Sequence, residues 1–493
     1  MMKPDTMSFT RAICLMAILT LFAAGNRSVA QTKVERIDAL MKIAYDYGQF
    51  NGSVLVAEHG KVIYKKGFGY ANMEWDIPNQ PDTKFRLGSI TKQFTSMLIL
   101  QLVEQGKLKL DGKITDYLPD YPKKNGDRIT IHHLLTHTSG TPNYTDFPAF
   151  FRTMSRNPST PQDFLKVFAD SALLFEPGTR FSYSNSGYFI LGVIIEKITG
   201  KPYEQVLQEN IFTPLGMNNS GYDHSGTILK KRAAAYEKDG PGFVNAAYID
   251  MSLPFSAGAL YSTVEDLYLW DQALYTEKLL PEKTKALLFK PYIPAFGVGY
   301  GYGWGVGNAP IGHTTDSAMT IGHGGGINGF NTLLSRIPSE KDLVVLLNNT
   351  GGTRLGQLCR AIWGILYDKP YDLPKRSIAD TVYTAIAEHG LIAGVGLYRE
   401  LKDHHADTYE VREDEMNRYG YRFLQAGKVK EAIEVFKMNV ESFPKSSNVY
   451  DSLGEAYLAD GDKEQAIKNY QKSVELDPNN TGGIEALKKL QAK

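Results

Sequence analysis

A spacing of 34 residues runs through the C-terminal part of this 493-residue chain and limits its fold more narrowly than any other feature. The recurring positions are Gly420 and Gly454, Gly427 and Gly461, Ala432 and Ala466, Phe436 and Tyr470, and Pro444 and Pro478. A repeat of this length is one supersecondary unit that buries its apolar face only against neighbouring units. The order of small residues, an aromatic residue and a proline predicts two helices per unit, so we expect residues 413–493 to form an all-α domain.

The repeat resembles the tetratricopeptide repeat, a family of paired helices. That resemblance implies either a groove for a protein partner or a packing platform for the rest of the chain, and the sequence leaves both open. Upstream, Lys369–Arg376 contains prolines and is expected to be a linker, and the helical segment 378–404 is expected to be a degenerate unit. We therefore assign 369–412 to a linker and a degenerate helical repeat, and 413–493 to tetratricopeptide repeats.

The first thirty residues have the pattern of a secretory signal peptide. Lys3 and Arg11 precede the apolar run Ala12–Ala24, and small residues ending at Ala30 follow it. The run is too short to span a bilayer, and no later segment is long and apolar enough to do so. We expect residues 1–30 to be cleaved after Ala30, leaving a secreted, periplasmic protein without a transmembrane segment. An uncleaved anchor helix is the alternative.

The charge and cysteine counts exclude two classes of protein. Basic and acidic side chains number 54 each, so the formal net charge is +0. Nucleic-acid binding needs a basic surface, so no nucleic-acid partner is expected. The two cysteines, Cys14 and Cys359, cannot form the disulfide framework of a small secreted domain, and Cys359 is expected to be a buried thiol.

The order of elements in the first two thirds of the chain predicts an α+β fold. Alternating strands at 53–57 and 61–70 come first, and a strongly helical stretch from Ile90 to Gln105 follows. After a middle part of helical pieces and loops, two apolar runs of strand length occupy 329–337 and 342–348. Strands at both ends favour one largely antiparallel sheet that the two ends of this segment close.

Ser89 and Lys92 form a Ser-x-x-Lys motif at the start of the predicted helix. Residues three apart lie on one face of a helix, so the amine can reach the hydroxyl. A desolvated lysine with a lowered pKa can take the serine proton and so create a nucleophile. The N–H of Ser89 points outward at the helix start, where it can hold an oxyanion. A second copy, Ser442 to Lys445, falls at a repeat boundary with no other catalytic residue nearby in sequence.

Tyr183 and Asn185 form a Tyr-x-Asn motif ahead of a helical run. A tyrosine near an ammonium group can have a lowered pKa and share proton transfer with the lysine. The asparagine can donate a hydrogen bond to a substrate carbonyl and also hold the lysine. The same pattern recurs at Tyr70 and Asn72, so on its own the motif is compatible with ordinary loop chemistry.

His323, Gly324, Gly325 and Gly326 stand just before the predicted strand at 329–337. Successive glycines let a substrate backbone approach a strand edge closely, and the N–H of Gly326 is a candidate oxyanion donor. On its own, the segment is better explained as a flexible hairpin turn with a surface histidine.

Taken together and in this order, the motifs resemble the serine penicillin-recognising family, which includes class C β-lactamases, D-alanyl-D-alanine carboxypeptidases, D-aminopeptidases and related esterases. Further matching segments are Phe85–Gly88, Leu134–Gly140, Phe175–Gly178, Pro214–Met217 and Ala257–Thr263. The resemblance implies a β-lactamase-like sandwich over residues 31–368, in which helices flank an antiparallel sheet and a helical lobe lies beside it.

The resemblance also implies a role for each motif residue. Three residues would carry catalysis: Ser89 as the acylated nucleophile, Lys92 as its general base and Tyr183 as the acid that protonates the leaving group. Four would bind substrate: Asn185, His323, Gly324 and Gly325. The N–H groups of Ser89 and Gly326 would form the oxyanion hole, and no cofactor is implied.

The third motif departs from the usual Lys-Thr-Gly or Lys-Ser-Gly of the penicillin-active members. His323 is mostly neutral at pH 7 and Gly324 has no hydroxyl, so the cation that helps to grip a substrate carboxylate is missing. This disfavours β-lactams or a C-terminal D-alanine as natural substrates and favours the esterase and aminopeptidase branches. We expect the loops at 141–160 and 292–320 to set substrate choice.

The function that the sequence favours is an exported serine hydrolase that cleaves an ester or amide, D-amino-acid peptides included, through an acyl-enzyme on Ser89. One alternative is a non-catalytic module that senses a ligand and passes the signal to the repeats. Another is a repeat-based interaction protein with a fused hydrolase. A zinc site is not expected, because no acidic or cysteine partner completes the cluster His132, His133 and His137.

Overall fold

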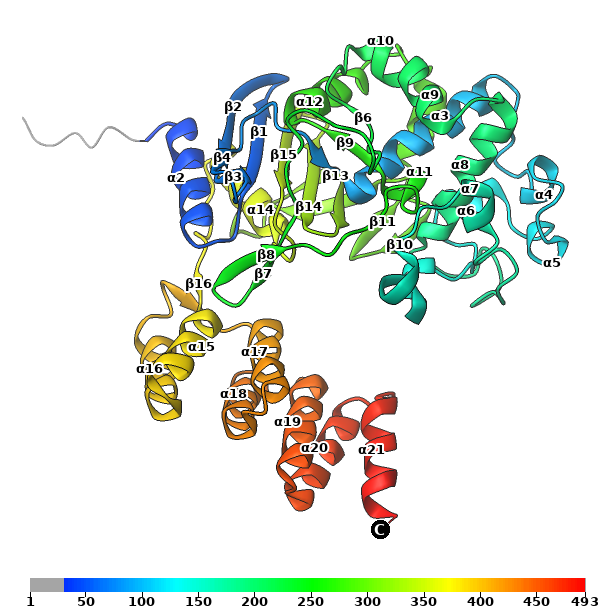
Figure 1. Cartoon of the computed structure of the whole chain (residues 1–493). Coiled ribbons are helices and arrows are strands. Elements are labelled where there is room, and N and C mark those ends of the chain that lie inside the picture. Colours follow the sequence, from blue (N-terminus) through cyan, green and yellow to red (C-terminus); the bar gives the residue numbers. More distant parts are fainter. Residues whose placement is uncertain (1–30, 493) are drawn as a thin grey trace, which may run out of the picture.

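A computed structural model describes residues 31–492, so the predicted signal peptide at 1–30 lies outside the described residues. The described chain consists of a sheet flanked by helices, a helical lobe on one side of it and an arm of helices that leaves the body (Figure 1). Within residues 31–492, no helix is long and apolar enough to cross a membrane.

The central sheet confirms the predicted antiparallel arrangement. In the described part of the chain its strand order is β10-β11-β12-β13-β14-β15-β1-β2, and all neighbours are antiparallel. The bounds are β1 (Gly52–Glu58), β2 (Lys61–Phe68), β10 (Ile293–Ala295), β11 (Val298–Tyr300), β12 (Gly305–Pro310), β13 (Ser317–Ile327), β14 (Phe330–Ile337) and β15 (Asp342–Asn348). Because β1 pairs with β15, from Gly52 opposite Asn348 onward, strands from the two ends of the segment close the sheet, as the sequence predicted.

Helices cover both faces of this sheet, which explains why β15 is buried along its whole length. On one face, α2 (Lys33–Asp46) and α14 (Leu355–Leu366) pack on apolar side chains of β1, β14 and β15. On the other face, α12 (Val264–Ala273) and α3 (Thr91–Glu104) belong to a larger core that continues into the helical lobe.

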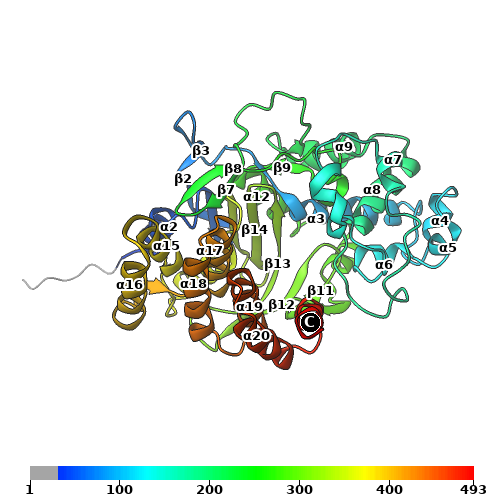
Figure 2. The ribbon, with the colours of Figure 1, turned by 60° about the horizontal axis from the view of Figure 1, so that its bottom comes forward.

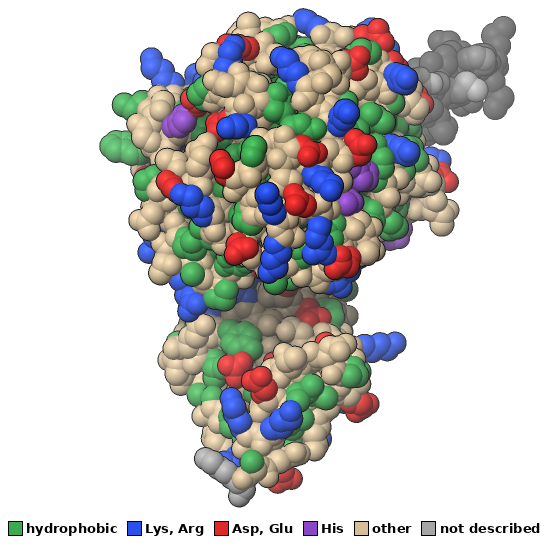
Figure 3. Space-filling model, turned by 90° about the vertical axis from the view of Figure 1, so that its right-hand side faces the viewer, with side chains coloured by type: hydrophobic (Ala, Val, Ile, Leu, Met, Phe, Trp, Pro, Cys, Tyr) green, Lys and Arg blue, Asp and Glu red, His purple; other side chains and the backbone are tan. Residues whose placement is uncertain are grey.

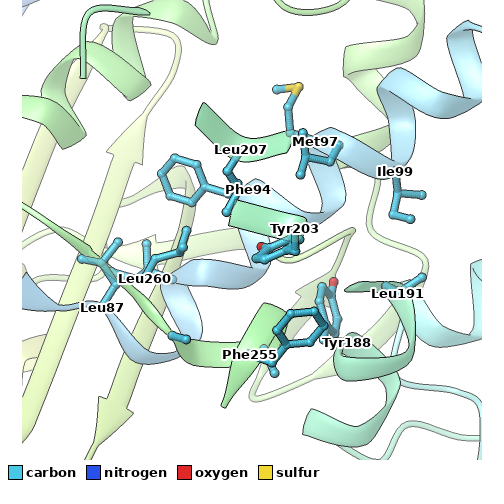
Figure 4. Close-up of a cluster of buried hydrophobic side chains, with 14 of the residues drawn as sticks. Leu87, Phe94, Met97, Ile99, Tyr188, Leu191, Tyr203, Leu207, Phe255 and Leu260 are labelled. Carbon is cyan, nitrogen blue, oxygen red and sulfur yellow. The ribbon is translucent and has the colours of Figure 1, made fainter. Parts of the chain in front are cut away.

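The lobe is built around α8 (Asn185–Thr199), an apolar helix that is buried along most of its length. Figure 4 shows Phe94 of α3, Tyr188 of α8 and Phe255 as members of one buried cluster, in which Tyr188 and Phe255 lie next to each other. Short helices complete the lobe and its surroundings: α4 (Ile114–Tyr117), α5 (Lys123–Gly126), α6 (Ile131–Leu135), α7 (Pro161–Leu165), α9 (Tyr203–Leu207), α10 (Thr213–Leu215), α11 (Phe255–Gly258) and α13 (Glu282–Lys285). The single turns are η1 (Gly88–Ile90), η2 (Tyr144–Asp146), η3 (Phe150–Met154), η4 (Gln208–Phe212) and η5 (Ala286–Phe289).

Smaller sheets join these parts. They are formed by β3 (Tyr70–Asn72) with β4 (Ile77–Pro78), β5 (Phe85–Arg86) with β9 (Leu260–Ser262) and β6 (Gly221–Tyr222), β7 (Tyr236–Asp239) with β8 (Gly242–Asn245), and β16 (Arg376–Ser377) with β17 (Tyr409–Glu410). The β7–β8 hairpin touches the arm, because Lys238 pairs with Asp380 at 2.6 Å and Asp239 pairs with Arg422 at 2.6 Å.

The arm is all-α, as predicted. Its helices are α15 (Ile378–His389), α16 (Leu391–His404), α17 (Glu413–Gln425), α18 (Val429–Ser442), α19 (Ser447–Asp460), α20 (Lys463–Leu476) and α21 (Thr481–Gln491). Figure 2 brings the arm forward and shows the helices from α16 to α20 side by side in one row. Within the predicted degenerate repeat, α15 and α16 pack on the next pair, where the Tyr398 hydroxyl donates to Met438 O at 3.0 Å.

The 34-residue spacing reflects a contact between a glycine and an aromatic ring that occurs in both repeats of the arm. A Cβ on Gly420 would lie 2.3 Å from the ring of Phe436, and a Cβ on Gly454 would lie 3.2 Å from the ring of Tyr470. In each unit the first helix therefore presents a glycine to the aromatic ring of the second. The surface shown in Figure 3 mixes both signs of charge over the body and the arm, in line with the zero net charge.

The two glycine contacts predict different responses to the same substitution. Gly420→Ala should destabilise α17 and α18 by about 1–3 kcal/mol, because the buried ring of Phe436 must move. Gly454→Ala is the matched control, since its looser contact lets the better helix propensity of alanine, about 1 kcal/mol, offset the crowding. Hydrogen exchange of the arm amides measures both effects, and equal changes in the two variants would contradict this packing.

Candidate active site

Ser89 lies on the single turn η1, which leads directly into α3. The turn is pressed against β13: Gly88 has a φ of 55°, and a Cβ on it would lie 2.8 Å from Gly326 N. A side chain at position 88 would therefore be strained and would also push the strand away. The close approach brings the N–H of Gly326 next to the turn that carries Ser89.

Lys92 lies one helical turn after Ser89 and is fully buried. Its Nζ lies 3.0 Å from Ser89 Oγ, 2.8 Å from Asn185 Oδ1 and 2.9 Å from Ala257 O. Burial lowers the pKa of Lys92 well below its usual value. The neutral amine can donate to the two carbonyl oxygens, and this turns its lone pair toward the Ser89 hydroxyl.

Tyr183 lies beside this amine, with its ring centroid 4.9 Å from Lys92 Nζ. Among the described residues its buried hydroxyl has no hydrogen bond of good geometry. Burial raises the pKa of Tyr183, and the Ser89 hydroxyl acts in the opposite direction. Burial therefore dominates, and the pKa of Tyr183 moves in the direction opposite to the lowering that the motif suggested.

Asn185 is the first residue of α8, and its orientation is fixed from outside the motif. Its backbone N–H donates to Asn143 Oδ1 at 3.0 Å, and its side-chain Nδ2 faces Thr145 Oγ1 at 3.5 Å. Because the amide nitrogen faces Thr145, the amide oxygen faces Lys92.

The segment from His323 to Ile327 forms an open strand edge at the site. β12 pairs with β13 only as far as Gly305 opposite Gly322, so residues 323–327 have a partner strand, β14, on one side only. A Cβ on Gly325 would lie 1.9 Å from Leu87 O, whereas a Cβ on Gly324 would meet nothing closer than 3.6 Å. Gly325 thus allows the edge to lie against the turn that holds Ser89.

The turn between β13 and β14 determines which backbone N–H groups of β13 bond to β14 and which face the open edge. β13 and β14 join through Asn328 and Gly329, so the flanking pair Ile327 and Phe330 exchanges backbone hydrogen bonds. Every second residue of β13 then turns its N–H away from β14. The N–H groups of Gly324 and Gly326 therefore face the open edge, where a substrate or an oxyanion can accept them.

His323 lies at the start of this edge and is neutral. Its Nε2 lies 3.0 Å from the Tyr300 hydroxyl, and its Nδ1 lies 2.5 Å from Gly324 O. Burial lowers the pKa of His323 to about 4. At pH 7 it thus presents no positive charge to a substrate.

Sequence reasoning missed His137 and Tyr300 as members of the site. His137 is buried with a φ of 57°, its ring centroid lies 4.2 Å from that of Tyr183, and its Nε2 lies 3.2 Å from the Tyr300 hydroxyl. The segment Leu134–Gly140 was recognised only as a family match. His132 turns elsewhere, toward Tyr302 at 2.8 Å, so the neighbouring histidines do not share one site.

A cavity of about 510 Å³ opens at Ser89 and runs past Tyr183, Tyr300 and His323. Phe296 stands at its mouth, 74% exposed, on the β10–β11 turn. A smaller cavity of about 90 Å³ is also lined by Ser89, together with Phe150 and Phe151. Ser89 thus lines two cavities.

The second copies of the motifs lie elsewhere. Ser442 ends α18, where its hydroxyl lies 2.7 Å from that of Tyr398 within the arm. Tyr70 and Asn72 belong to β3. The structure therefore gathers the predicted residues of the first copies, Ser89, Lys92, Tyr183, Asn185 and 323–326, around one cleft.

Comparison with known proteins agrees with this arrangement. A family model described as Beta-lactamase matches residues 34–364, and one described as Tetratricopeptide repeat matches residues 447–480. Penicillin-binding protein 4* of Bacillus subtilis (strain 168) is 33% identical over 369 residues, which cover 70% of this chain and 79% of that protein.

Two solved structures are similar to this chain over most of their own length. D-amino acid amidase from Ochrobactrum anthropi SV3 has a TM-score of 0.60 and 26% identity, covering 68% of this chain and 98% of that one. The hydrolase EstCE1, with promiscuous acyltransferase activity, has a TM-score of 0.59 and 26% identity, covering 67% and 97%. The chain therefore belongs to the β-lactamase family of serine hydrolases and carries tetratricopeptide repeats after its hydrolase domain.

Proposed function

We propose that this protein is an exported hydrolase that cleaves an uncharged ester or amide through an acyl-enzyme on Ser89. The observation that carries the proposal is the buried amine of Lys92, which lies 3.0 Å from the Ser89 hydroxyl and is oriented by two carbonyl acceptors. A general base must lie within hydrogen-bonding distance of the proton that it takes, as this amine does, and burial lowers the pKa of Lys92 well below its usual value, which favours the neutral form.

The reaction begins when Lys92 takes the Ser89 proton and Oγ bonds to the substrate carbonyl carbon. The N–H groups of Ser89 and Gly326 bind the oxyanion. As it collapses, the bond to the leaving group breaks, the Tyr183 hydroxyl gives that group a proton, and Lys92 returns a proton to Tyr183. Water then attacks the acyl-enzyme and gives its proton to the same pair, which releases the acid and restores Ser89.

The proposed substrate is uncharged where it meets β13 and apolar on both sides of the scissile bond. His323 is neutral, and exposed phenylalanines, Phe296 and Phe151, stand at the two cavities. Both lie in the loops that the sequence singled out for substrate choice. The similar proteins named as an amidase and as a hydrolase with acyltransferase activity support acyl transfer from an amide or ester.

Export and partner binding complete the proposal. Export to the periplasm rests on the signal pattern of residues 1–30. The arm is proposed to hold a protein partner, and its match to the tetratricopeptide repeat supports that role.

Turnover of matched substrates tests the proposal. We expect hydrolysis of an aryl-substituted nitrophenyl ester and of a D-phenylalanine amide, with little hydrolysis of a penicillin. Ser89→Ala should lower the rate by about 10³-fold or more, whereas Ser442→Ala, in the second Ser-x-x-Lys, should not change it. Equal rates in Ser89→Ala and the unaltered protein would contradict the proposal.

The pH dependence of kcat/KM should report Lys92. Protonated Lys92 cannot accept the Ser89 proton, so kcat/KM rises with pH as the amine deprotonates. Because burial lowers the pKa of Lys92, the rise should be complete well below the ordinary lysine value of about 10.4. Lys92→Arg, which stays charged, should be inactive throughout, and a rise centred on the ordinary value would contradict the role of a desolvated base.

A matched pair of glycine variants tests the strand edge. Gly325→Ala should lower kcat/KM by about 10²-fold, because a Cβ 1.9 Å from Leu87 O must displace β13 from the turn holding Ser89. Gly324→Ala adds the same methyl group at an ordinary contact distance, 3.6 Å from Thr332 O, and should cause a much smaller loss. Steady-state kinetics on the neutral ester distinguishes them, and equal losses would count against this placement of the oxyanion donors.

A further inference from the structure

Tyr300 places one buried hydroxyl between two imidazole rings. Its side chain is 1% exposed and comes from the end of β11. The hydroxyl lies 3.2 Å from Nε2 of His137, in the helical lobe, and 3.0 Å from Nε2 of His323, in the sheet. One tyrosine thus connects the two walls of the cleft.

The direction of this hydrogen-bond chain is set at its lobe end. The backbone N–H of Ser184 donates to His137 Nδ1 at 3.1 Å, so that nitrogen carries no proton. His137 is neutral, because burial lowers its pKa well below the usual value. Its single ring proton is therefore on Nε2 and is donated to the oxygen of Tyr300.

At the sheet end of the chain, the partners of His323 determine which of its ring nitrogens carries the proton. The Gly324 carbonyl can only accept, so the ring proton of neutral His323 is on Nδ1, which donates to Gly324 O at 2.5 Å. His323 Nε2 then carries no proton and accepts the Tyr300 hydroxyl hydrogen at 3.0 Å. The opposite tautomer would bring the lone pair of Nδ1 against the Gly324 carbonyl oxygen, which is unfavourable.

We infer that Tyr300, together with His137, is a positioning residue that holds His323 as the neutral Nδ1–H tautomer against the strand edge. The chain runs from the Ser184 N–H, next to Tyr183, to the Gly324 carbonyl, so it fixes the lobe wall relative to the edge. Given the proposed function, this end of the cleft selects substrates without a carboxylate there, because a fixed imidazole with Nδ1–H committed to Gly324 offers an anion neither charge nor a free donor.

Nitrogen NMR of the imidazole rings tests the tautomer directly and needs no activity. In the full chain labelled with ¹⁵N-histidine, His323 should show the Nδ1–H pattern at pH 7, with its signals assigned by their loss in His323→Gln. Tyr300→Phe should abolish that single-tautomer pattern. Tyr302→Phe is the matched control, because Tyr302 is equally buried and bonds His132 instead, so His323 should be unaffected.

Kinetics provide the second measurement. On a neutral ester, Tyr300→Phe should lower kcat/KM by about tenfold, the loss expected for one hydrogen bond. Most of this loss should come from a lower kcat and less of it from a higher KM. Tyr300→Phe should also lower the ratio of kcat/KM for that ester to kcat/KM for its analogue with a carboxylate on the acyl group. Tyr302→Phe should leave this ratio unchanged. If Tyr300→Phe fails to fold, His137→Asn, which tolerates a positive φ, replaces it.

The outcomes separate this inference from the proposed function. An Nε2–H or charged His323 in the unaltered protein would overturn the inference whatever the activity. The inference would also be overturned if Tyr300→Phe and Tyr302→Phe showed the same His323 tautomer and the same preference for the neutral ester over its carboxylate analogue. The expected tautomer without turnover of any ester or amide would support the positioning role and contradict the proposed function.

Discussion

The burial of one amine is the constraint on which the site depends. Lys92 reaches Ser89 on the turn immediately before its helix, but its two carbonyl acceptors come from α8 and α11, far along the chain. The lobe and the sheet must therefore pack together before the amine is desolvated and oriented. An exposed lysine on the same helix would stay charged and could not act as the base.

The packing of the lobe against the sheet also explains why Gly88, Gly325 and Tyr300 lie around the nucleophile. Gly88 and Gly325 let the turn and β13 approach to a distance that a side chain would prevent. Across the cleft, Tyr300 connects the two walls through His137 and His323. The site is thus held by close backbone contact on one side and by a hydrogen-bond chain on the other.

What the sequence could predict depended on whether the signal was local. The 34-residue spacing predicted the arm, because a glycine against an aromatic ring recurs within each unit. The order of apolar runs predicted the antiparallel sheet, and the spacing of Ser89 and Lys92 predicted their contact. In contrast, burial raises the pKa of Tyr183, opposite to the lowering that the motif suggested, because desolvation depends on the completed fold. The bond between His137 and Tyr300 spans 163 residues and follows no local pattern.

Acylation of Ser89, with the Lys92 amine as base, is the step on which the proposed function depends. Intact mass measured after quenching a reaction with a slowly hydrolysed aryl ester tests it most directly. We expect a mass increase of one acyl group, mapped to the peptide that contains Ser89 and absent from Ser89→Ala and Lys92→Arg. An acyl group on another residue, or no acyl group during active turnover, would contradict it.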